Sequence, residues 1–406
     1  MAGMTLRRIP AVLMRGGTSK GVFFLADDLP ADPAARDRLL LRVIGSPDPY
    51  RQHIDALGGA TSSTSKVVVL SRSTRPGCDV DYLFGAVAVE APVIDWSGNC
   101  GNLSAAVGPF AIQAGLVTAP PDGIATVRIW QANIGRRILA HVPMRHGAVQ
   151  EQGDFLLDGV AFPAAEIRLE FLDPAAEDGD DAGGALFPTG RPVDRLVVPG
   201  LGAVEATLIN AGNPTLFIAA AALGLRGTEG QGDVNGDAAL LARAEAVRAH
   251  GAVAMGLAAS APAATATRPH TPKLAVVAAP ADYVAADGRP VAADRIDLLV
   301  RIFSMGRLHH AMTGTGAVAI AAAAAIPGTL VHRLAPVGDD GRVCFGHPSG
   351  TLSVGAEAVH TDGGWRVTAV RMSRSARVLM EGFVRVPDEV PAADPLASGS
   401  RPAPLR

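Results

Sequence analysis

The stretch NCGNLSAAVGPFAIQA, residues 99–114, sets a cysteine and small polar residues at the start of an alanine-rich run. Residues 102–114 are small and apolar enough to predict a buried helix that ends at Gly115. A second stretch of the same style, TGTGAVAIAAAAAI (residues 313–326), lies about half the chain further on. This internal repeat predicts two similar domains, each with one central helix whose N-terminus is exposed.

Two such helix starts facing one cleft would form a site for anionic ligands. Their free backbone N–H groups and the positive ends of their dipoles point the same way. The candidate binding residues at these starts are Gly101, Asn102, Thr313, Gly314 and Thr315. Buried alanine-rich helices are common, so an ordinary core without a site is the alternative.

The composition of the chain limits the classes of function. Hydrophobic residues make up 48% of the 406 residues and charged residues 18%, which excludes a largely disordered chain. The net charge of −3 argues against a nucleic-acid binder that is held by phosphate charge. Three cysteines in so long a chain do not describe a disulfide scaffold.

No segment of the sequence predicts a membrane anchor or a secretion signal. The most apolar segment, residues 316–326, is about half the length of a membrane span. Residues 1–17 contain no continuous apolar stretch of signal-peptide length. We therefore expect a cytoplasmic protein.

The rest of the chain alternates strand-like and helical stretches. Expected strands include residues 9–13, 22–25, 66–70, 80–89, 125–130, 203–210, 216–220 and 274–278, and expected helices include 34–44 and 238–250. Residues 259–267, rich in Ala, Pro and Thr, are expected to form a loop. The acidic, glycine-rich segment 174–185 is the best candidate linker. It predicts domains at 1–185 and 186–390, followed by a frayed tail at 391–406.

Cys100 and Lys66 are the residues best suited to proton transfer. A cysteine at a helix N-terminus has a stabilised thiolate and can exchange protons near neutral pH. A lysine that leads an apolar strand after a hydroxyl-rich loop is partly desolvated, which helps it to act as a neutral base. The alternatives are a buried inert cysteine and a surface lysine at a strand end. Cys78 and Cys344 lack such surroundings.

Two further motifs carry polar side chains. Residues 15–21 (RGGTSKG) resemble a backbone nest for an anion such as a carboxylate, or else form an ordinary hairpin turn. His309 and His310 are adjacent, and neighbouring residues of a helix or strand do not face the same way. We therefore expect no metal site at this pair, and no other spacing in the chain suggests one.

Many short motifs follow one another in an order typical of one enzyme family. They are residues 14–21 (MRGGTSKG), 45–48 (GSPD), 55–59 (DALGG), 64–66 (TSK), 79–82 (DVDY), 99–102 (NCGN), 130–133 (WQAN), 347–350 (HPSG), 373–377 (SRSAR) and 380–382 (MEG). From about residue 8 to 387 the chain resembles the 2-methylaconitate isomerase family of the methylcitrate route of propionate breakdown. Each motif is short, but so many in one order are specific.

The resemblance implies a fold and a change in mechanism. The family belongs to the diaminopimelate-epimerase-like superfamily, an α+β fold of two pseudo-symmetric domains, each a curved, mostly antiparallel sheet around a central helix. Epimerases of the superfamily use two facing cysteines. Cys100 matches the first, whereas Thr313 stands at the second, and a hydroxyl is far too weak an acid to replace a thiol. The isomerase family uses a lysine instead, which Lys66 matches.

The resemblance also implies the chemistry, a cofactor-independent isomerisation of a small unsaturated tricarboxylate, most closely 2-methylaconitate. Lys66 would remove an allylic proton and Cys100 would return one, or the two could exchange roles. Expected substrate contacts are Arg15, Ser19, Ser65, Gly101, Asn102, Asn213, His310, Thr313, Gly314, Thr315 and Arg374. No cofactor, nucleic acid or membrane partner is expected, and a homodimer is compatible with this size.

Two other functions stay open. A 4-oxalomesaconate tautomerase of aromatic-acid degradation shares the fold and the positions of Lys66 and Cys100. Residues 95–98 (DWSG) before the cysteine favour the methylaconitate family over it. A non-catalytic carboxylate-binding protein on the same scaffold is the second alternative, and it would be expected to lose Lys66 or Cys100.

Overall fold

In the first half of the chain a curved sheet wraps around one buried helix, α2 (Ser104–Gln113). A second helix, α1 (Pro33–Ile44), covers the outer face of this sheet; Asp32 caps its start and the left-handed Gly45 ends it. The strands of this half are β1 (Leu6–Gly16), β2 (Ser19–Leu25), β3 (Lys66–Arg72), β4 (Val80–Val87), β5 (Ile94–Asp95), β6 (Gly123–Gln131), β7 (Arg136–Arg145), β8 (Ala148–Val149) and β9 (Ile167–Leu172).

The second half repeats this arrangement around the buried helix α6 (Gly314–Ala324). Its outer face carries α4 (Ala238–Ala254), with α5 (Ala261–Thr267) against it, and two short helices are α3 (Gln231–Asn235) and α7 (Leu330–Leu334). Its strands are β10 (Asp194–Val198), β11 (Gly202–Ala211), β12 (Asn213–Ala219), β13 (Lys273–Ala278), β16 (Leu298–Ser304), β17 (Arg307–Leu308), β18 (Arg342–His347), β19 (Gly350–Thr361) and β20 (Gly364–Arg374), with a separate hairpin of β14 (Tyr283–Val284) and β15 (Pro290–Val291).

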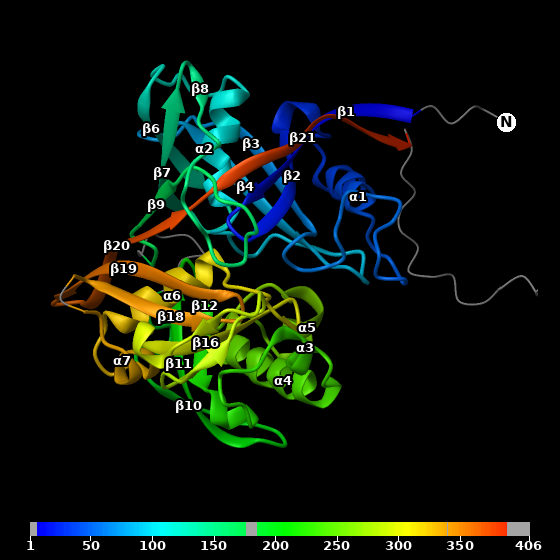
Figure 1. Cartoon of the computed structure of the whole chain (residues 1–406). Coiled ribbons are helices and arrows are strands. Elements are labelled where there is room, and N and C mark those ends of the chain that lie inside the picture. Colours follow the sequence, from blue (N-terminus) through cyan, green and yellow to red (C-terminus); the bar gives the residue numbers. More distant parts are fainter. Residues whose placement is uncertain (1–5, 176–184, 339, 388–406) are drawn as a thin grey trace, which may run out of the picture.

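The two halves form two lobes with the same strand topology (Figure 1). In the first lobe β2 is antiparallel to β1 and parallel to β3, β3 is antiparallel to β4, and β4 is parallel to β6. In the second, β12 is antiparallel to β11 and parallel to β13, β13 is antiparallel to β16, and β16 is parallel to β18. Therefore β3 and β13 hold equivalent places, as do α2 and α6.

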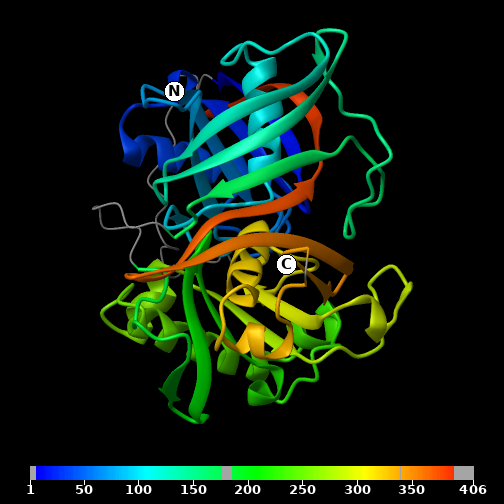
Figure 2. The same ribbon diagram turned by 90° about the vertical axis from the view of Figure 1, so that its left-hand side faces the viewer.

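The chain crosses between the lobes twice. It leaves the first lobe after β9 and returns to it with β21 (Ala376–Pro387), which pairs along β1 (Figure 2). Because β9 also pairs with β20, the strands of both lobes join into one 19-stranded sheet. The last strand of the chain thus belongs to the first lobe, so the two lobes do not correspond to one cut in the sequence.

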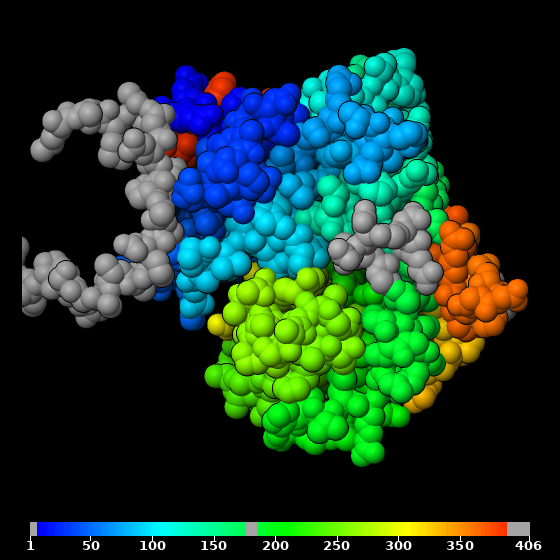
Figure 3. All heavy atoms as spheres, turned by 180° about the vertical axis from the view of Figure 1, so that it is seen from behind, coloured from blue at the N-terminus to red at the C-terminus, as the bar shows by residue number. Residues whose placement is uncertain are grey.

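This computed structural model describes residues 6–175, 185–338 and 340–387. Most of the expected linker and the whole expected tail, residues 391–406, lie outside the described residues. Seen from behind, the two lobes meet along a broad seam (Figure 3). Within the described parts of the chain, no helix is long and apolar enough to cross a membrane.

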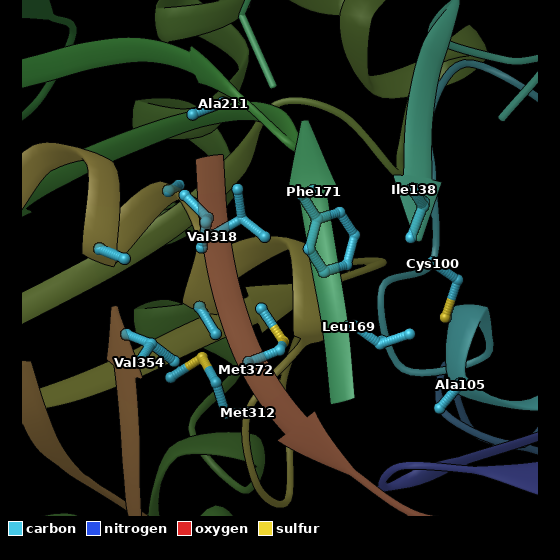
Figure 4. Packing of buried hydrophobic residues seen from close by; sticks show 14 of the residues in the cluster. Cys100, Ala105, Ile138, Leu169, Phe171, Ala211, Met312, Val318, Val354 and Met372 are labelled. Carbon is cyan, nitrogen blue, oxygen red and sulfur yellow. The ribbon is translucent and has the colours of Figure 1, made fainter. Parts of the chain in front are cut away.

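The largest apolar cluster extends across both lobes. It contains most of the apolar side chains of α2 and α6 together with the sheet residues around them. Figure 4 shows Leu169 and Phe171 of β9 between the first-lobe residue Cys100 and the second-lobe residues Met312 and Val318. A core shared in this way fixes the two helix starts relative to each other.

The expectation of a loop at 259–267 is wrong, because residues 261–267 form α5. Ser260 caps this helix by accepting a hydrogen bond from the backbone N–H of Ala263, and a proline stands in the first turn. Both are helix-start signals that the Ala, Pro and Thr composition concealed. The other expected helices and strands are confirmed to within a few residues at their ends.

Candidate active site

The starts of the two central helices meet between the lobes. A Cβ atom added at Gly101 would lie 2.7 Å from the carbonyl carbon of Gly314 and 2.8 Å from the backbone nitrogen of Thr315. Because non-bonded carbon atoms rest at about 3.5–4.0 Å, only glycine allows this approach. The backbone N–H groups at both helix starts therefore lie in one region, which is the geometry that favours an anionic ligand.

Asn102 holds the first helix start against the second lobe. Its Nδ2 donates to the backbone carbonyl of Met312 at 3.0 Å and to Oγ1 of Thr18 at 3.0 Å. The Thr18 hydroxyl also donates to the Met312 carbonyl at 3.2 Å. Asn102 Oδ1 accepts from Nε of Arg374 at 3.1 Å. The Asn102 side chain is therefore committed to positioning the loop.

Asn213 makes the equivalent contacts from the second lobe. Its Oδ1 accepts from the backbone N–H of Asn99 at 2.7 Å, and its Nδ2 donates to the Asn99 carbonyl at 2.9 Å and to Oγ1 of Thr315 at 3.2 Å. Each lobe therefore holds a backbone segment that leads into the other lobe's central helix. Asn213 of the second lobe binds Asn99, and Asn102 of the first lobe binds Met312. These contacts fix the backbone on both sides of Cys100.

Cys100 lies four residues before Ser104, at the beginning of the turn that leads into α2, and is 7% exposed. Its Sγ accepts the backbone N–H of Leu103 at 3.5 Å. Its carbonyl oxygen accepts from Oγ of Ser104 at 3.1 Å and from the buried hydroxyl of Tyr82 at 3.3 Å. The thiol is therefore held at a helix N-terminus, as the sequence predicts, with a rigid backbone behind it.

Lys66 begins β3 and is 5% exposed. Its Nζ lies 5.0 Å from the centre of the Phe84 ring, so the ammonium is covered by an aromatic face on one side. The prediction of a desolvated amine at the head of an apolar strand is correct in its geometry. A Cβ atom added at Gly21 would lie 3.0 Å from the side chain of Leu103 and 3.2 Å from Cβ of Lys66, so Lys66 lies beside the segment that follows Cys100.

Lys273 is a site residue that the sequence reasoning missed. It begins β13, is 1% exposed, and lies close enough to Lys66 for that charge to lower its pKa. Burial is the larger cause, and together they lower the pKa of Lys273 to about 7. A usable signal was present, because Lys66 and Lys273 are two of only three lysines, the third being Lys20, among 36 basic residues.

Arg374 adds a third buried cation. It ends β20, is 1% exposed, and burial lowers its pKa to about 10, although the nearby Cys100 raises it. Across the described residues, Lys66, Lys273 and Arg374 take part in no salt bridge with a carboxylate. Buried cations without counter-ions are costly. This excess of positive charge favours an anionic ligand.

Two cavities open at the edge of this region. One of about 650 Å³ is lined by Arg15, Ser19 and neighbours, and one of about 550 Å³ lies on the other side of Ser63 and His310, which line both. Burial and the charge of Lys66 lower the pKa of His310. Neither cavity is lined by Lys66, Cys100 or Lys273, so both lie beside the buried groups of the site, and His310 lines each of them.

The rings of His309 and His310 are stacked, with centroids 4.6 Å apart and an interplanar angle of 24°. The expectation that adjacent histidines face different ways is therefore wrong. These residues follow β17 in a segment that is neither helix nor strand, so the alternation rule does not apply. Burial lowers the pKa of His309 well below its usual value.

The side chains of three expected substrate-contact residues form hydrogen bonds with other groups of the protein. Arg15 donates to the carbonyls of Gly17 and Ser375 at 3.1 and 2.9 Å, and burial lowers its pKa. The Ser65 hydroxyl lies 3.4 Å from Nδ1 of His53. Thr313 Oγ1 accepts the backbone N–H of Gly316 at 3.1 Å and so caps α6. As a helix cap, this hydroxyl has a structural role where a second thiol would stand.

Comparison with solved structures gives the class of protein. The crystal structure of methylitaconate-delta-isomerase superposes with a TM-score of 0.73 at 38% identity, covering 98% of this chain and 99% of that one. A probable proline racemase from Agrobacterium radiobacter, 14% identical with a TM-score of 0.53 over 96% and 94% of the chains, shares the fold. The expected α+β fold of the diaminopimelate-epimerase-like superfamily is therefore confirmed.

Comparison with protein families is more specific. The model of the PrpF protein family matches residues 6–387, so the chain belongs to this family. The 2-methyl-aconitate isomerase of Shewanella oneidensis is 62% identical over 387 residues, which cover 94% of this chain and 97% of that protein. The resemblance inferred from the motifs is confirmed.

Proposed function

We propose that the chain is an isomerase that converts 2-methylaconitate by removing and returning a proton. The observation that carries this proposal is the set of buried cations beside the joined helix starts, Lys66, Lys273 and Arg374. Three buried basic groups without carboxylate partners in the described chain favour a polyanionic ligand, and Lys273 and Arg374 stay available to bind its carboxylates when Lys66 acts as the base. The 62% sequence identity to a 2-methyl-aconitate isomerase supports the choice of this tricarboxylate as the substrate.

The proposed reaction balances as a proton shift. The neutral amine of Lys66 takes an allylic proton, and the electron pair of the broken C–H bond spreads over the double bond and a carboxylate as a dienolate. The thiol of Cys100 then gives a proton to another carbon, or to the same carbon after rotation. Backbone N–H groups at the two helix starts stabilise the extra charge on the carboxylate. Lys66 and Cys100 exchange their protonation states back through solvent.

The expected contact residues fall into two groups, those with groups available to a substrate and those that hold the surrounding backbone. Backbone groups at Gly101, Gly314 and Thr315 lie beside the site, and Ser19 and His310 line a cavity beside it. We propose these as substrate contacts, with Asn102, Asn213, Arg15 and Thr313 holding the backbone around them. Arg374 would bind a carboxylate while its Nε stays on Asn102. The proposed chemistry uses no cofactor, because the backbone N–H groups of the two helix starts would stabilise the dienolate that the amine base forms.

The wider setting follows from the substrate. We propose that the enzyme serves the methylcitrate route of propionate breakdown and works in the cytoplasm. A homodimer is proposed on size alone, and gel filtration with light scattering tests it directly.

A substrate panel tests the function. Wild type should isomerise 2-methylaconitate faster than aconitate or oxalomesaconate, measured by the change in absorbance of the conjugated alkene. Lys66→Arg keeps a positive charge but cannot act as a base near neutral pH. It should therefore bind the saturated tricarboxylate tricarballylate and lose isomerisation. Arg226→Met, at an arginine that is 84% exposed and pairs with Glu229, is the control.

The panel also separates the alternatives. Fastest turnover of oxalomesaconate would assign the chain as a tautomerase of that acid instead. Binding of tricarballylate with no turnover of any acid would make the chain a non-catalytic binding protein. Full activity in Lys66→Arg would reject Lys66 as the base.

A further inference from the structure

Lys273 occupies the position in the second lobe that Lys66 occupies in the first. Lys66 is the first residue of β3, which is parallel to β2 and antiparallel to β4. Lys273 is the first residue of β13, which is parallel to β12 and antiparallel to β16. The two amines therefore approach the interlobe region from equivalent strand ends.

The choice of lysine at these two positions is itself informative. The chain contains three lysines among 36 basic residues, so arginine is its ordinary cation. Arginine stays charged at any accessible pH, whereas lysine gains and loses a proton when it is buried. Two of the three lysines are buried where the lobes meet, and both are titratable groups in the same site.

The contacts of Lys273 leave one donor free. Its Nζ donates to Oγ of Ser304 at 2.9 Å and lies 3.0 Å from Nδ1 of His270. Nε2 of His270 lies 3.3 Å from the Asn99 carbonyl and 3.3 Å from Nδ2 of Asn213. Because both hydrogens of that Nδ2 have other acceptors, on Asn99 and Thr315, Nε2 donates to the Asn99 carbonyl and Nδ1 accepts from Lys273. An ammonium has three donors, and among the described residues Nζ has these two partners. Both partners are uncharged.

The charges around Lys273 come from both lobes. Lys66 and Arg248 lower its pKa, whereas Asp95 and Cys100 raise it, and burial is the largest cause of its fall to about 7. Both oxygens of Asp95 already accept backbone N–H groups, from Ser97 at 2.8 Å and from His270 at 2.8 Å. Among the described residues no hydrogen bond or salt bridge joins Asp95 to the amine, whose partners are Ser304 and His270.

A continuous set of contacts links Lys273 to the proposed base. The Phe84 ring lies 5.0 Å from Nζ of Lys66 and has its centre 5.4 Å from that of His270. Asn99, whose carbonyl His270 contacts, is the residue before Cys100. Lys273 therefore borders the same reaction region as Lys66 and Cys100.

We infer that Lys273 is a substrate-binding residue whose free N–H donor binds one carboxylate of the substrate, with Ser304 and His270 fixing its direction. The inference rests on the proposed function, since it assigns one carboxylate of that substrate to one amine. The substrate carboxylate would be the counter-ion of the Lys273 amine, which has no carboxylate partner in the described part of the chain. Because an anion favours the charged amine, the protein takes up a proton when the substrate binds.

The pH dependence of this proton uptake distinguishes Lys273 from the buried histidines. At pH 8 the free amine is mostly neutral and becomes charged in the complex, so uptake approaches about one proton. At pH 6 the amine is already charged, so its uptake falls toward zero. Histidines whose pKa values are lowered, such as His310, would give uptake that grows as the pH falls instead.

Proton uptake on binding is measured by titration calorimetry with tricarballylate in buffers of different ionisation enthalpy. Wild type should show uptake that rises from pH 6 to pH 8. Lys273→Met should lose it, and should bind tricarballylate about 10- to 100-fold more weakly, as expected for one charged hydrogen bond. In Lys66→Met the uptake should persist and move to higher pH, because the charge that lowers the pKa of Lys273 is gone.

Kinetics give an independent outcome. Lys273→Met should raise the KM for 2-methylaconitate about 10- to 100-fold and change kcat by less than about 10-fold, whereas Lys66→Met should lose kcat. An unchanged KM and unchanged uptake in Lys273→Met would overturn the inference while leaving the isomerase assignment intact. If Lys273→Met does not fold, flat or acid-increasing uptake in wild type overturns it equally. Absence of isomerisation in wild type would instead reject the proposed function.

Discussion

Gly314→Ala tests whether the close approach of the two helix starts creates the site. A Cβ atom at Gly314 would lie 2.5 Å from the backbone nitrogen of Asn102 and 2.7 Å from Cα of Gly101. Ordinary contacts of this kind need about 3.5 Å or more, so the helix starts must separate by about 1 Å. Both obstructing atoms are backbone, which cannot move aside as a side chain can. Gly314 has no positive φ, so the effect is one of space alone.

The magnitude follows from this displacement. A misplacement of about 1 Å in a catalytic site costs about 100-fold in rate, so kcat/KM for 2-methylaconitate should fall by about that factor. Overpacking of a core contact costs about 1–3 kcal/mol, so the unfolding free energy in urea should fall by that amount. The kinetic assay is run well below the melting temperature, so that the loss of rate does not reflect unfolding.

Gly232→Ala is the matched control for this substitution. Gly232 lies in α3, and a Cβ atom there would meet nothing within 4 Å. This variant should keep wild-type kcat/KM and unfold no more easily than wild type. If Gly314→Ala behaves like Gly232→Ala in both assays, the two helix starts do not need their glycine contact, and our account of the site is wrong.

Three further substitutions have defined outcomes. Thr18→Val leaves one N–H of the Asn102 amide unpaired and removes one of the two donors to the Met312 carbonyl, so urea unfolding should show a loss of about 1–3 kcal/mol. Tyr82→Phe removes one of several donors to the Cys100 carbonyl, so it should cost about 1 kcal/mol in the same assay, and kcat should change by less than about threefold. Burial lowers the pKa of His347 to about 3, so the unfolded chain takes up a proton below pH 6.5 that the folded protein refuses. The free energy of unfolding should therefore decrease as the pH is lowered from about 6.5 to 3, by up to about 1.4 kcal/mol per pH unit. His347→Asn should remove this part of the pH dependence in unfolding curves. An unchanged pH dependence would exclude His347 as its source.

Local patterns in the sequence predicted the helices and much of the site. The residues 99–102 and 313–315 gave both helix starts, because small residues before an apolar run are a local signal. Lys66 was found because it leads a run of β-branched residues. Neither inference required knowing which segments lie side by side.

Long-range contacts explain what was missed. Lys273 follows Thr271 and Pro272 with no glycine-rich frame, and its position becomes meaningful only when β13 is matched with β3. The pairing of β21 with β1 joins residues 360 or more positions apart, which no local pattern encodes. The hydrogen bonds by which Asn102 and Asn213 join the two lobes likewise depend on partners in the opposite lobe.

Deuterium exchange tests whether Lys66 and Cys100 together move one proton of the substrate. Proton NMR of 2-methylaconitate in D₂O is followed with wild type, Lys66→Met and Cys100→Ser side by side. We predict that wild type isomerises the acid and places deuterium at an allylic carbon, and that Lys66→Met does neither. Isomerisation by wild type without any deuterium in substrate or product, or full exchange by Lys66→Met, would contradict this mechanism.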